Sequence, residues 1–180
     1  MPVRSRVARR CAATAVTAVA LVALLAGPAW AHVEIEPSTA TKGAEHAVLS
    51  FTVPNEREDA STTEIAVQIP EEAKFESVRA QAKPGWTIAF EKDGEAVKTI
   101  TWSGGEIKPD EFDLFTISVG AIPKKGTHFV FPTLQTYSDG EVVRWIEEAE
   151  EDAPEPEHPA PELELVKAKS GSEDEHGHDD

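Results

Sequence analysis

The chain has 180 residues, of which 33 are acidic and 17 are basic, so its net charge at neutral pH is −16. This excess of negative charge argues against nucleic acid and anionic lipid surfaces as partners. A single cysteine, Cys11, excludes an internal disulfide.

Residues 1–31 have the pattern of a secretory signal peptide. Four arginines and no acidic residue occupy the first ten positions, residues 12–26 are apolar, and Ala29-Trp30-Ala31 has the small-x-small form of a cleavage site. The apolar run is too short to span a membrane, and no other run approaches 18 residues. We therefore expect a secreted or periplasmic protein that begins at His32, has no membrane span and carries a net charge of −20.

From His32 to about residue 146, short strand-forming segments alternate with turn residues. Alternation of apolar and polar side chains is clearest in residues 47–53 and 112–119, and the Asp-Gly pairs at 93–94 and 139–140 are typical of tight hairpins. The expected strands are residues 33–36, 47–53, 64–69, 75–80, 86–91, 97–102, 112–119, 128–136 and 141–146. Without helical periodicity between them, they predict an all-β fold, an antiparallel β-sandwich of immunoglobulin or cupredoxin type, over residues 32–167.

The C-terminal part has three expected segments. Residues 147–161 are acidic and rich in proline, which predicts an extended connection, and residues 162–167 alternate like an edge strand. Residues 168–180 are polar and predict a disordered tail. Because His176 and His178 stand among acidic residues there, the tail could bind metal loosely, although a solvated terminus explains it equally simply.

An amino-terminal histidine is a metal chelate in itself. After cleavage, His32 would offer its α-amine and its imidazole Nδ1 to one ion, and nitrogen donors of this kind favour Cu(II) among the divalent first-row metals. The alternative is that His32 merely follows a cleavage site.

Strand pairing suggests a third ligand. If residues 33–36 and 47–53 are antiparallel neighbours, the start of the first lies near the end of the second, which places Glu56 beside His32. A carboxylate oxygen beside two histidine nitrogens suits Cu(II), whereas a solvated carboxylate in an acidic loop is the simpler interpretation. The remaining histidines, His46, His128 and His158, are isolated in the sequence, and we interpret them as structural or surface residues.

Several motifs resemble the YcnI-type extracellular copper-binding domain over about residues 31–166. They are Ala31-His32-Val33, Pro37, Phe51-Thr52-Val53-Pro54-Asn55-Glu56, Pro84-Gly85-Trp86-Thr87, Glu111-Phe112 with Phe115, and the run LQTYSDGEVVRW at 134–145. The resemblance implies a β-sandwich that binds Cu(II) through a mono-histidine brace. It also implies a glutamate that completes the ligand set and a tryptophan beside the metal.

Carried over to this sequence, the metal-site residues are His32, Glu56 and Trp145. Glu91 and Glu111 also lie in matching segments, so the choice of glutamate stays open between them and Glu56. Trp145 could instead be a core residue, although Trp86 and Trp102, each in an apolar strand, fit that role better.

The resulting functional hypothesis is an exported Cu(II)-binding protein, not an enzyme, that acquires, buffers or delivers copper to a membrane or periplasmic copper-handling protein. One alternative is a metal-free structural or interaction β-sandwich, since this fold serves many functions. Another is a copper mono-oxygenase, which needs a second histidine and usually a flat substrate face. No second histidine has a clear route to His32, because His46 is expected at the far end of the first hairpin.

Overall fold

The computed structural model describes residues 32–149, 153–154 and 156–168. The expected signal peptide and nearly all of the expected tail, with His176 and His178, lie outside the described residues. Within the described part of the chain, no helix has the length and apolar character needed to cross a membrane.

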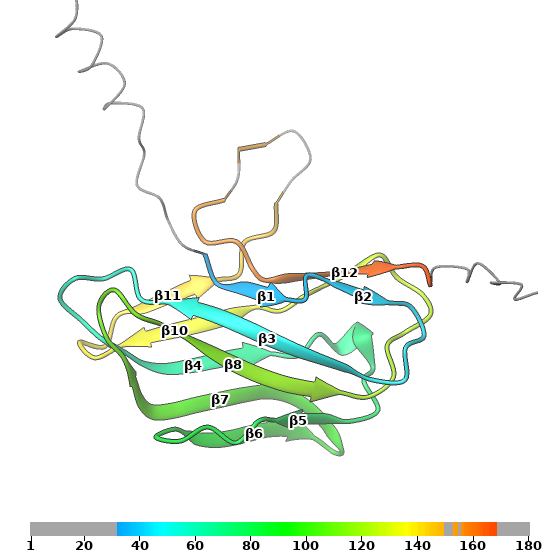
Figure 1. Ribbon diagram of the computed structural model, residues 1–180, viewed down its shortest axis with the longest axis horizontal. Helices are drawn as coiled ribbons and strands as arrows, with labels where there is room; N and C mark the ends of the chain where they lie inside the picture. Colours follow the sequence, from blue (N-terminus) through cyan, green and yellow to red (C-terminus); the bar gives the residue numbers. More distant parts are fainter. Residues whose placement is uncertain (1–31, 150–152, 155, 169–180) are drawn as a thin grey trace, which may run out of the picture. The chain divides into compact units, whose positions relative to one another are not determined.

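The strands form three sheets (Figure 1). The first has the order β1 (Glu34–Glu36), β3 (Ala47–Pro54), β8 (Phe112–Val119), β5 (Val78–Ala80). The second has the order β11 (Val142–Trp145), β10 (Thr133–Tyr137), β4 (Thr62–Gln68), β7 (Ala96–Ile107), β6 (Thr87–Asp93). The third, smaller sheet has the order β2 (Thr39–Thr41), β12 (Glu162–Val166), β9 (His128–Val130), and one 3-10 turn, Glu71–Ala73, follows β4.

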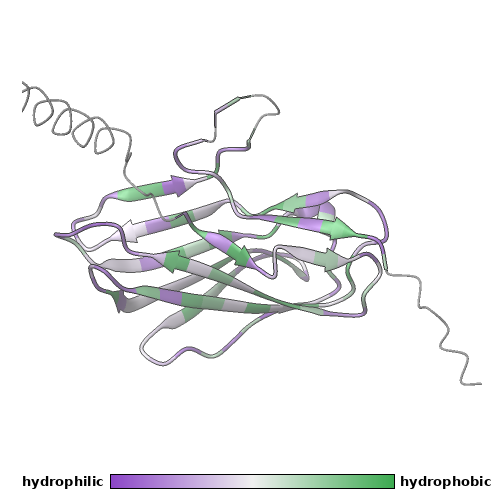
Figure 2. Cartoon of the chain, turned by 45° about the horizontal axis from the view of Figure 1, so that its top comes forward, coloured by the Kyte–Doolittle hydropathy of each residue, from purple (hydrophilic) through white to green (hydrophobic). Residues whose placement is uncertain are grey.

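The first two sheets pack face to face around one core, as the alternating sequence pattern predicts. Leu49, Phe51 and Val53 on β3 are fully buried, and the polar residues between them are not. Across the interface, Trp102 of β7 meets Phe115 of β8 with ring centroids 5.4 Å apart. Hydrophobic residues are concentrated in the strands and hydrophilic residues in the loops (Figure 2). The expected all-β sandwich is therefore confirmed.

Two features of the small sheet differ from the sequence-based expectation. The predicted strand 162–167 exists as β12, but it lies between β2 and β9 and is not an edge strand. Its pairing with β2 is parallel, which adds one parallel pair to an otherwise antiparallel fold. Leu163 and Leu165 are buried on one side of β12, which explains the alternation that the sequence displays.

The predicted strand 128–136 is two strands in two different sheets. The backbone N–H of Phe131 donates to the carbonyl of Pro161, beside the small sheet, whereas the carbonyl of Pro132 accepts from Gln68 in the second sheet. Since proline has no N–H to continue a ladder, the chain changes sheets at this position. Strand β2 was not predicted from the sequence.

Candidate functional site

The candidate site lies where the first strand begins. In β1, Glu34 pairs with Thr52 and Ile35 with Phe51 of β3, in antiparallel register. His32, two residues before Glu34, therefore lies at the end of β3 where Pro54 leads into Glu56. The predicted pairing of these two strands is confirmed, and it brings His32 and Glu56 together.

The loop that carries Glu56 is fixed on both sides of that residue. The Asn55 amide Nδ2 is buried and donates to the carbonyls of Ala60 and Ile107, at 2.8 and 2.9 Å. Its Oδ1 accepts from the backbone N–H of Arg57 at 2.9 Å. The Glu56 side chain therefore extends from a backbone that side-chain hydrogen bonds hold in one conformation.

Trp145 is the buried aromatic residue of the candidate site. It is the last residue of β11, and only 1% of its surface is exposed. Its indole Nε1 donates to the Oε1 of buried Gln135 at 3.0 Å. The Gln135 amide Nε2 in turn donates to the carbonyl of Pro54 at 2.9 Å and to the Thr62 hydroxyl at 2.8 Å. Gln135 thus fixes the orientation of the indole relative to the strand that ends beside Glu56.

His32, Glu56 and Trp145 meet at this end of the sandwich. The rings of His32 and Trp145 have centroids 6.0 Å apart at an angle of 59°. Burial raises the pKa of the Glu56 carboxyl above its ordinary value, while the nearby imidazoles of His32 and His158 act in the opposite direction. Burial, with the Glu56 charge as the next cause, also raises the pKa of the Tyr137 hydroxyl.

His158 is the residue that sequence reasoning missed. Its ring centroid lies 5.1 Å from that of Trp145, and its imidazole acts to lower the pKa of Glu56, so this structural or surface residue lies beside the candidate site. The structure thus places a second histidine beside the Trp145 ring, which the sequence analysis did not predict. No local sequence motif marks His158. Its place beside Trp145 results from the fold of the chain between β11 and β12, which a local pattern does not encode.

The other candidate residues lie elsewhere or serve other contacts. Glu91 is exposed on β6, at the opposite edge of the second sheet from β11. The Glu111 backbone carbonyl accepts from Asn55, but its carboxylate accepts from the backbone N–H of Lys108. Trp102 is a fully buried core residue, as expected, whereas Trp86 is only partly buried and packs on Phe115. The expectation that Trp86 fits a core role better than Trp145 was wrong, because Trp145 is the more deeply buried of the two. Of the three candidate glutamates, Glu56 is thus the one that the fold brings near His32.

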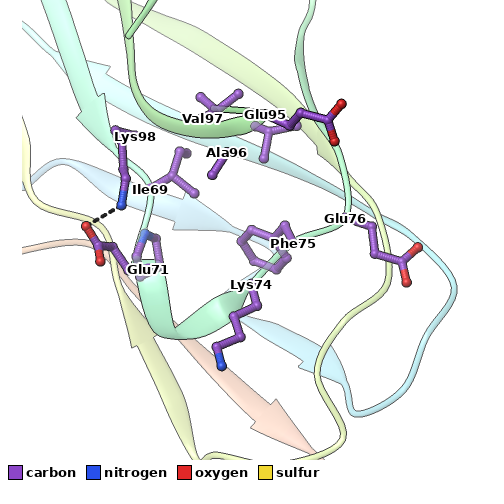
Figure 3. A pocket seen from close by; sticks show the side chains of 11 residues that line it. Ile69, Glu71, Lys74, Phe75, Glu76, Glu95, Ala96, Val97 and Lys98 are labelled. Atoms are coloured by element: carbon purple, nitrogen blue, oxygen red, sulfur yellow. Dashed lines mark hydrogen bonds and ion pairs between the residues drawn. The ribbon is translucent and has the colours of Figure 1, made fainter. Parts of the chain in front are cut away.

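A second hollow lies at the other end of β4, beside the 3-10 turn and the β6–β7 hairpin (Figure 3). It is lined by Ile69, Phe75 and Val97 together with charged residues, among which Lys98 forms an ion pair with Glu71. None of its lining residues is a histidine. It has no part in the site predicted from the sequence.

The donor chemistry at the Trp145 end fits a copper ion. The expected ligands are one amine nitrogen, one imidazole nitrogen and one carboxylate oxygen, of the borderline and hard types that Cu(II) accepts. Within the described residues, no three His, Cys, Asp or Glu side chains are arranged as a ready-made metal cluster. The expected set is of a different kind, since one of its donors is a main-chain amine.

The fold and this end of the sandwich define an immunoglobulin-like β-sandwich with histidine and carboxylate side chains grouped around a buried indole. Residues 32–165 match the family described as a domain of unknown function, DUF1775, and the chain belongs to that family. The resemblance to the YcnI-type family is thereby confirmed.

The comparisons also include one functionally named relative. The chain is 28% identical over 129 residues to the copper-binding protein CutI of Bacillus subtilis (strain 168). The match covers 71% of this chain and 61% of that relative, so the chain spans less than two thirds of the relative's length.

Two solved structures are similar. A crystal structure of an uncharacterized Nocardia farcinica protein with an immunoglobulin-like fold is 35% identical, covers 76% of this chain and 99% of that chain, and has a TM-score of 0.68. A cohesin module from a Clostridium perfringens family 33 glycoside hydrolase is 12% identical, covers 77% and 100%, and has a TM-score of 0.46. The second likeness is too distant to carry an argument.

Proposed function

We propose that this chain is an exported copper-binding protein whose ligands are the α-amine and imidazole Nδ1 of His32 and the carboxylate of Glu56. The observation that carries the proposal is the meeting of His32 and Glu56 beside the buried ring of Trp145. The relationship to a protein named for copper binding supports the choice of metal.

Removal of residues 1–31 is a necessary step in this proposal. A peptide nitrogen at His32 carries no lone pair suited to a metal, whereas a terminal amine does, so cleavage would create the chelate. The excess of acidic residues in the chain would favour accumulation of cations around it.

Copper is the cargo of the proposed protein and not a catalytic group. A set of three ligands leaves coordination positions that a partner's ligands can enter, which suits acquisition, buffering or delivery by ligand exchange. The proposed recipient is a membrane or periplasmic copper-handling protein, and no reaction of this chain's own is proposed.

The test compares two forms in a Cu(II) titration: the chain that begins at His32 and a form with one extra residue before it. We expect one Cu(II) per chain in the first form, with an axial electron paramagnetic resonance signal and partial quenching of tryptophan fluorescence. The extra residue turns the amine into an amide and should abolish both. A Trp145→Phe variant should bind copper with less quenching, because Trp86 and Trp102 lie in other parts of the sandwich.

Other outcomes would favour the alternatives. Equal and weak binding by both forms would assign the metal to the His176/His178 tail, and absence of binding would favour a metal-free interaction module. Because a second histidine lies near the site, mono-oxygenase activity is tested directly, by incubating the copper-loaded chain with a reductant and a polysaccharide. Oxidative chain cleavage that depends on His32 would overturn the proposal of a non-catalytic protein.

A further inference from the structure

Two imidazoles, and not one, lie against the Trp145 ring. The centroid of the indole is 6.0 Å from that of His32 and 5.1 Å from that of His158, at similar interplanar angles of 59° and 62°. The two histidines are 126 positions apart in the sequence, so the fold alone brings them to the same side chain.

The backbone of His158 is anchored, although it stands in an acidic, proline-rich connection. Its N–H donates to Glu147 Oε2 at 2.8 Å, and its carbonyl accepts from the Glu147 N–H at 3.2 Å. The N–H of Ala160 donates to the Glu147 carbonyl at 2.8 Å, in a parallel bridge that pairs Glu147 with Pro159. Because Glu147 follows Trp145 by two residues, this pairing holds His158 at a fixed position beside the indole.

The same segment lies along the first strand. His32 and Val33 line one shallow hollow together with Pro159 and Ala160, which directly follow His158. Figure 1 shows the orange end of the connection, where the chain enters β12, beside the start of β1. Both imidazoles act to lower the pKa of the Glu56 carboxyl, so Glu56 lies in the neighbourhood of both histidines.

We propose that His158 is a second imidazole ligand of the copper site, which makes the ligand set three nitrogens and one oxygen. This inference rests on the proposed function. Four donors of this kind complete the tetragonal arrangement that Cu(II) prefers, and neutral imidazole is a common ligand of this ion. The side chains of His32, Glu56 and His158 are not arranged as a ready-made metal cluster, so the proposal requires them to move when copper binds.

The experiment counts imidazoles on the bound metal. Electron spin echo envelope modulation of Cu(II)-loaded protein that begins at His32 reports the remote imidazole nitrogens, and two coupled imidazoles give combination lines that one does not. We expect two in the wild-type chain, one in His158→Ala, and two in a matched control, His46→Ala. His46 suits this control because it is exposed and precedes β3, at the end opposite the site.

Affinity supplies a second readout. His158→Ala should weaken Cu(II) binding by at least about tenfold, since loss of even an outer partner of a metal ligand costs that much. His158→Gln, which retains a polar side chain of similar length, should also lose one imidazole signal. Thermal unfolding of the metal-free variants establishes that each is folded.

The outcomes separate this inference from the proposed function. A single imidazole in the wild-type spectrum, or two in folded His158→Ala, would overturn the role of His158 while His32-dependent binding stood. If the extra residue before His32 left copper binding unchanged, the proposed function itself would fail. Two imidazoles that fall to one in both His158 variants would support the inference.

Discussion

At the scale of single residues, Glu56 is the carboxylate whose surroundings differ from those of the other acidic residues considered. It is half-buried between Asn55 and Arg57, both of which are held by hydrogen bonds, whereas Glu91 and Glu111 are exposed. Burial makes the Glu56 carboxyl costly to ionise, and this is the largest cause of its raised pKa. A bound cation would remove that cost, which is the behaviour expected of a metal ligand.

Replacement of Glu56 by glutamine tests this role. Glu56→Gln preserves the shape of the side chain but removes the anionic oxygen, so we expect Cu(II) affinity to fall by about tenfold or more. Because the pKa of Glu56 is raised on folding, its ionised form weakens the fold as pH rises above the ordinary carboxyl range near about 4. The metal-free variant should therefore be at least as stable as wild type at neutral pH.

The measurement pairs Cu(II) titration with urea unfolding of the metal-free protein. Glu111→Gln is the matched control, because Glu111 lies next to the same loop but its carboxylate bonds the Lys108 backbone. Equal losses of affinity in both variants, or none in Glu56→Gln, would remove Glu56 from the ligand set.

At the scale of elements, one arginine connects the Glu56 loop to the β10–β11 hairpin. The Arg57 guanidinium contacts Asp59 at 2.8 Å, Asp139 at 2.7 Å and Glu141 at 2.8 Å, and it lies 5.3 Å from the centre of the Tyr137 ring. Single surface ion pairs contribute little, but a network with this geometry can hold two loops in register. The hairpin that carries Trp145 is thereby tied to the loop that carries Glu56.

Asp139→Asn tests this connection through its pH dependence. A hydrogen bond from the Glu141 backbone N–H, and then the Arg57 guanidinium, hold the pKa of Asp139 below its usual value. A pKa lowered on folding adds stability above the unfolded pKa, about 3.9 for aspartate, and this stability is lost as pH falls through the folded value. We therefore expect Asp139→Asn to lower the urea midpoint at pH 7 and to differ less from wild type near about pH 3.

The control for that measurement is Asp93→Asn, in the other Asp-Gly hairpin of the sandwich. The urea midpoint of Asp93→Asn should differ from that of wild type by the same amount at both pH values. A constant difference between Asp139→Asn and wild type across the same range would show that the charge of Asp139 is not what stabilises the hairpin.

The elements also show how far local sequence determines this structure. The alternation in residues 112–119 predicted β8 to the residue, because one face of that strand is buried and the other is not. The site residues His32 and Glu56 were predictable from one strand pairing between neighbours in the chain. His158 was not, since its position depends on a backbone bridge to Glu147 that no local pattern encodes.

At the scale of the whole molecule, the proposed site joins parts of the chain that are far apart in sequence. His32 precedes the first strand, Glu56 follows β3, and His158 lies in the last connection before β12. A metal ion that needs all three side chains binds only the folded chain, because the unfolded chain does not hold these side chains together. Under the proposed function, metal binding and folding stability would therefore be linked.

Copper should accordingly stabilise the chain that begins at His32 against heat. With free Cu(II) at 100 times its Kd, linkage gives about 2.7 kcal/mol, which corresponds to a rise in Tm of roughly 5–10 °C for a domain of this size. The form with an extra residue before His32 should gain far less. Differential scanning calorimetry without Cu(II) and with free Cu(II) at 100 times its Kd measures both.

This comparison also separates the site from the tail without any mutation. A metal held by His176 and His178 alone, with no ligand from the sandwich, would bind the folded and unfolded chains equally, so it would leave the Tm unchanged however tightly it bound. A copper-dependent rise in Tm that disappears with the extra residue therefore locates the metal at the start of β1. An equal rise in both forms would mean that the amine of His32 is not a ligand, and the chelate would have to be sought among the side chains alone.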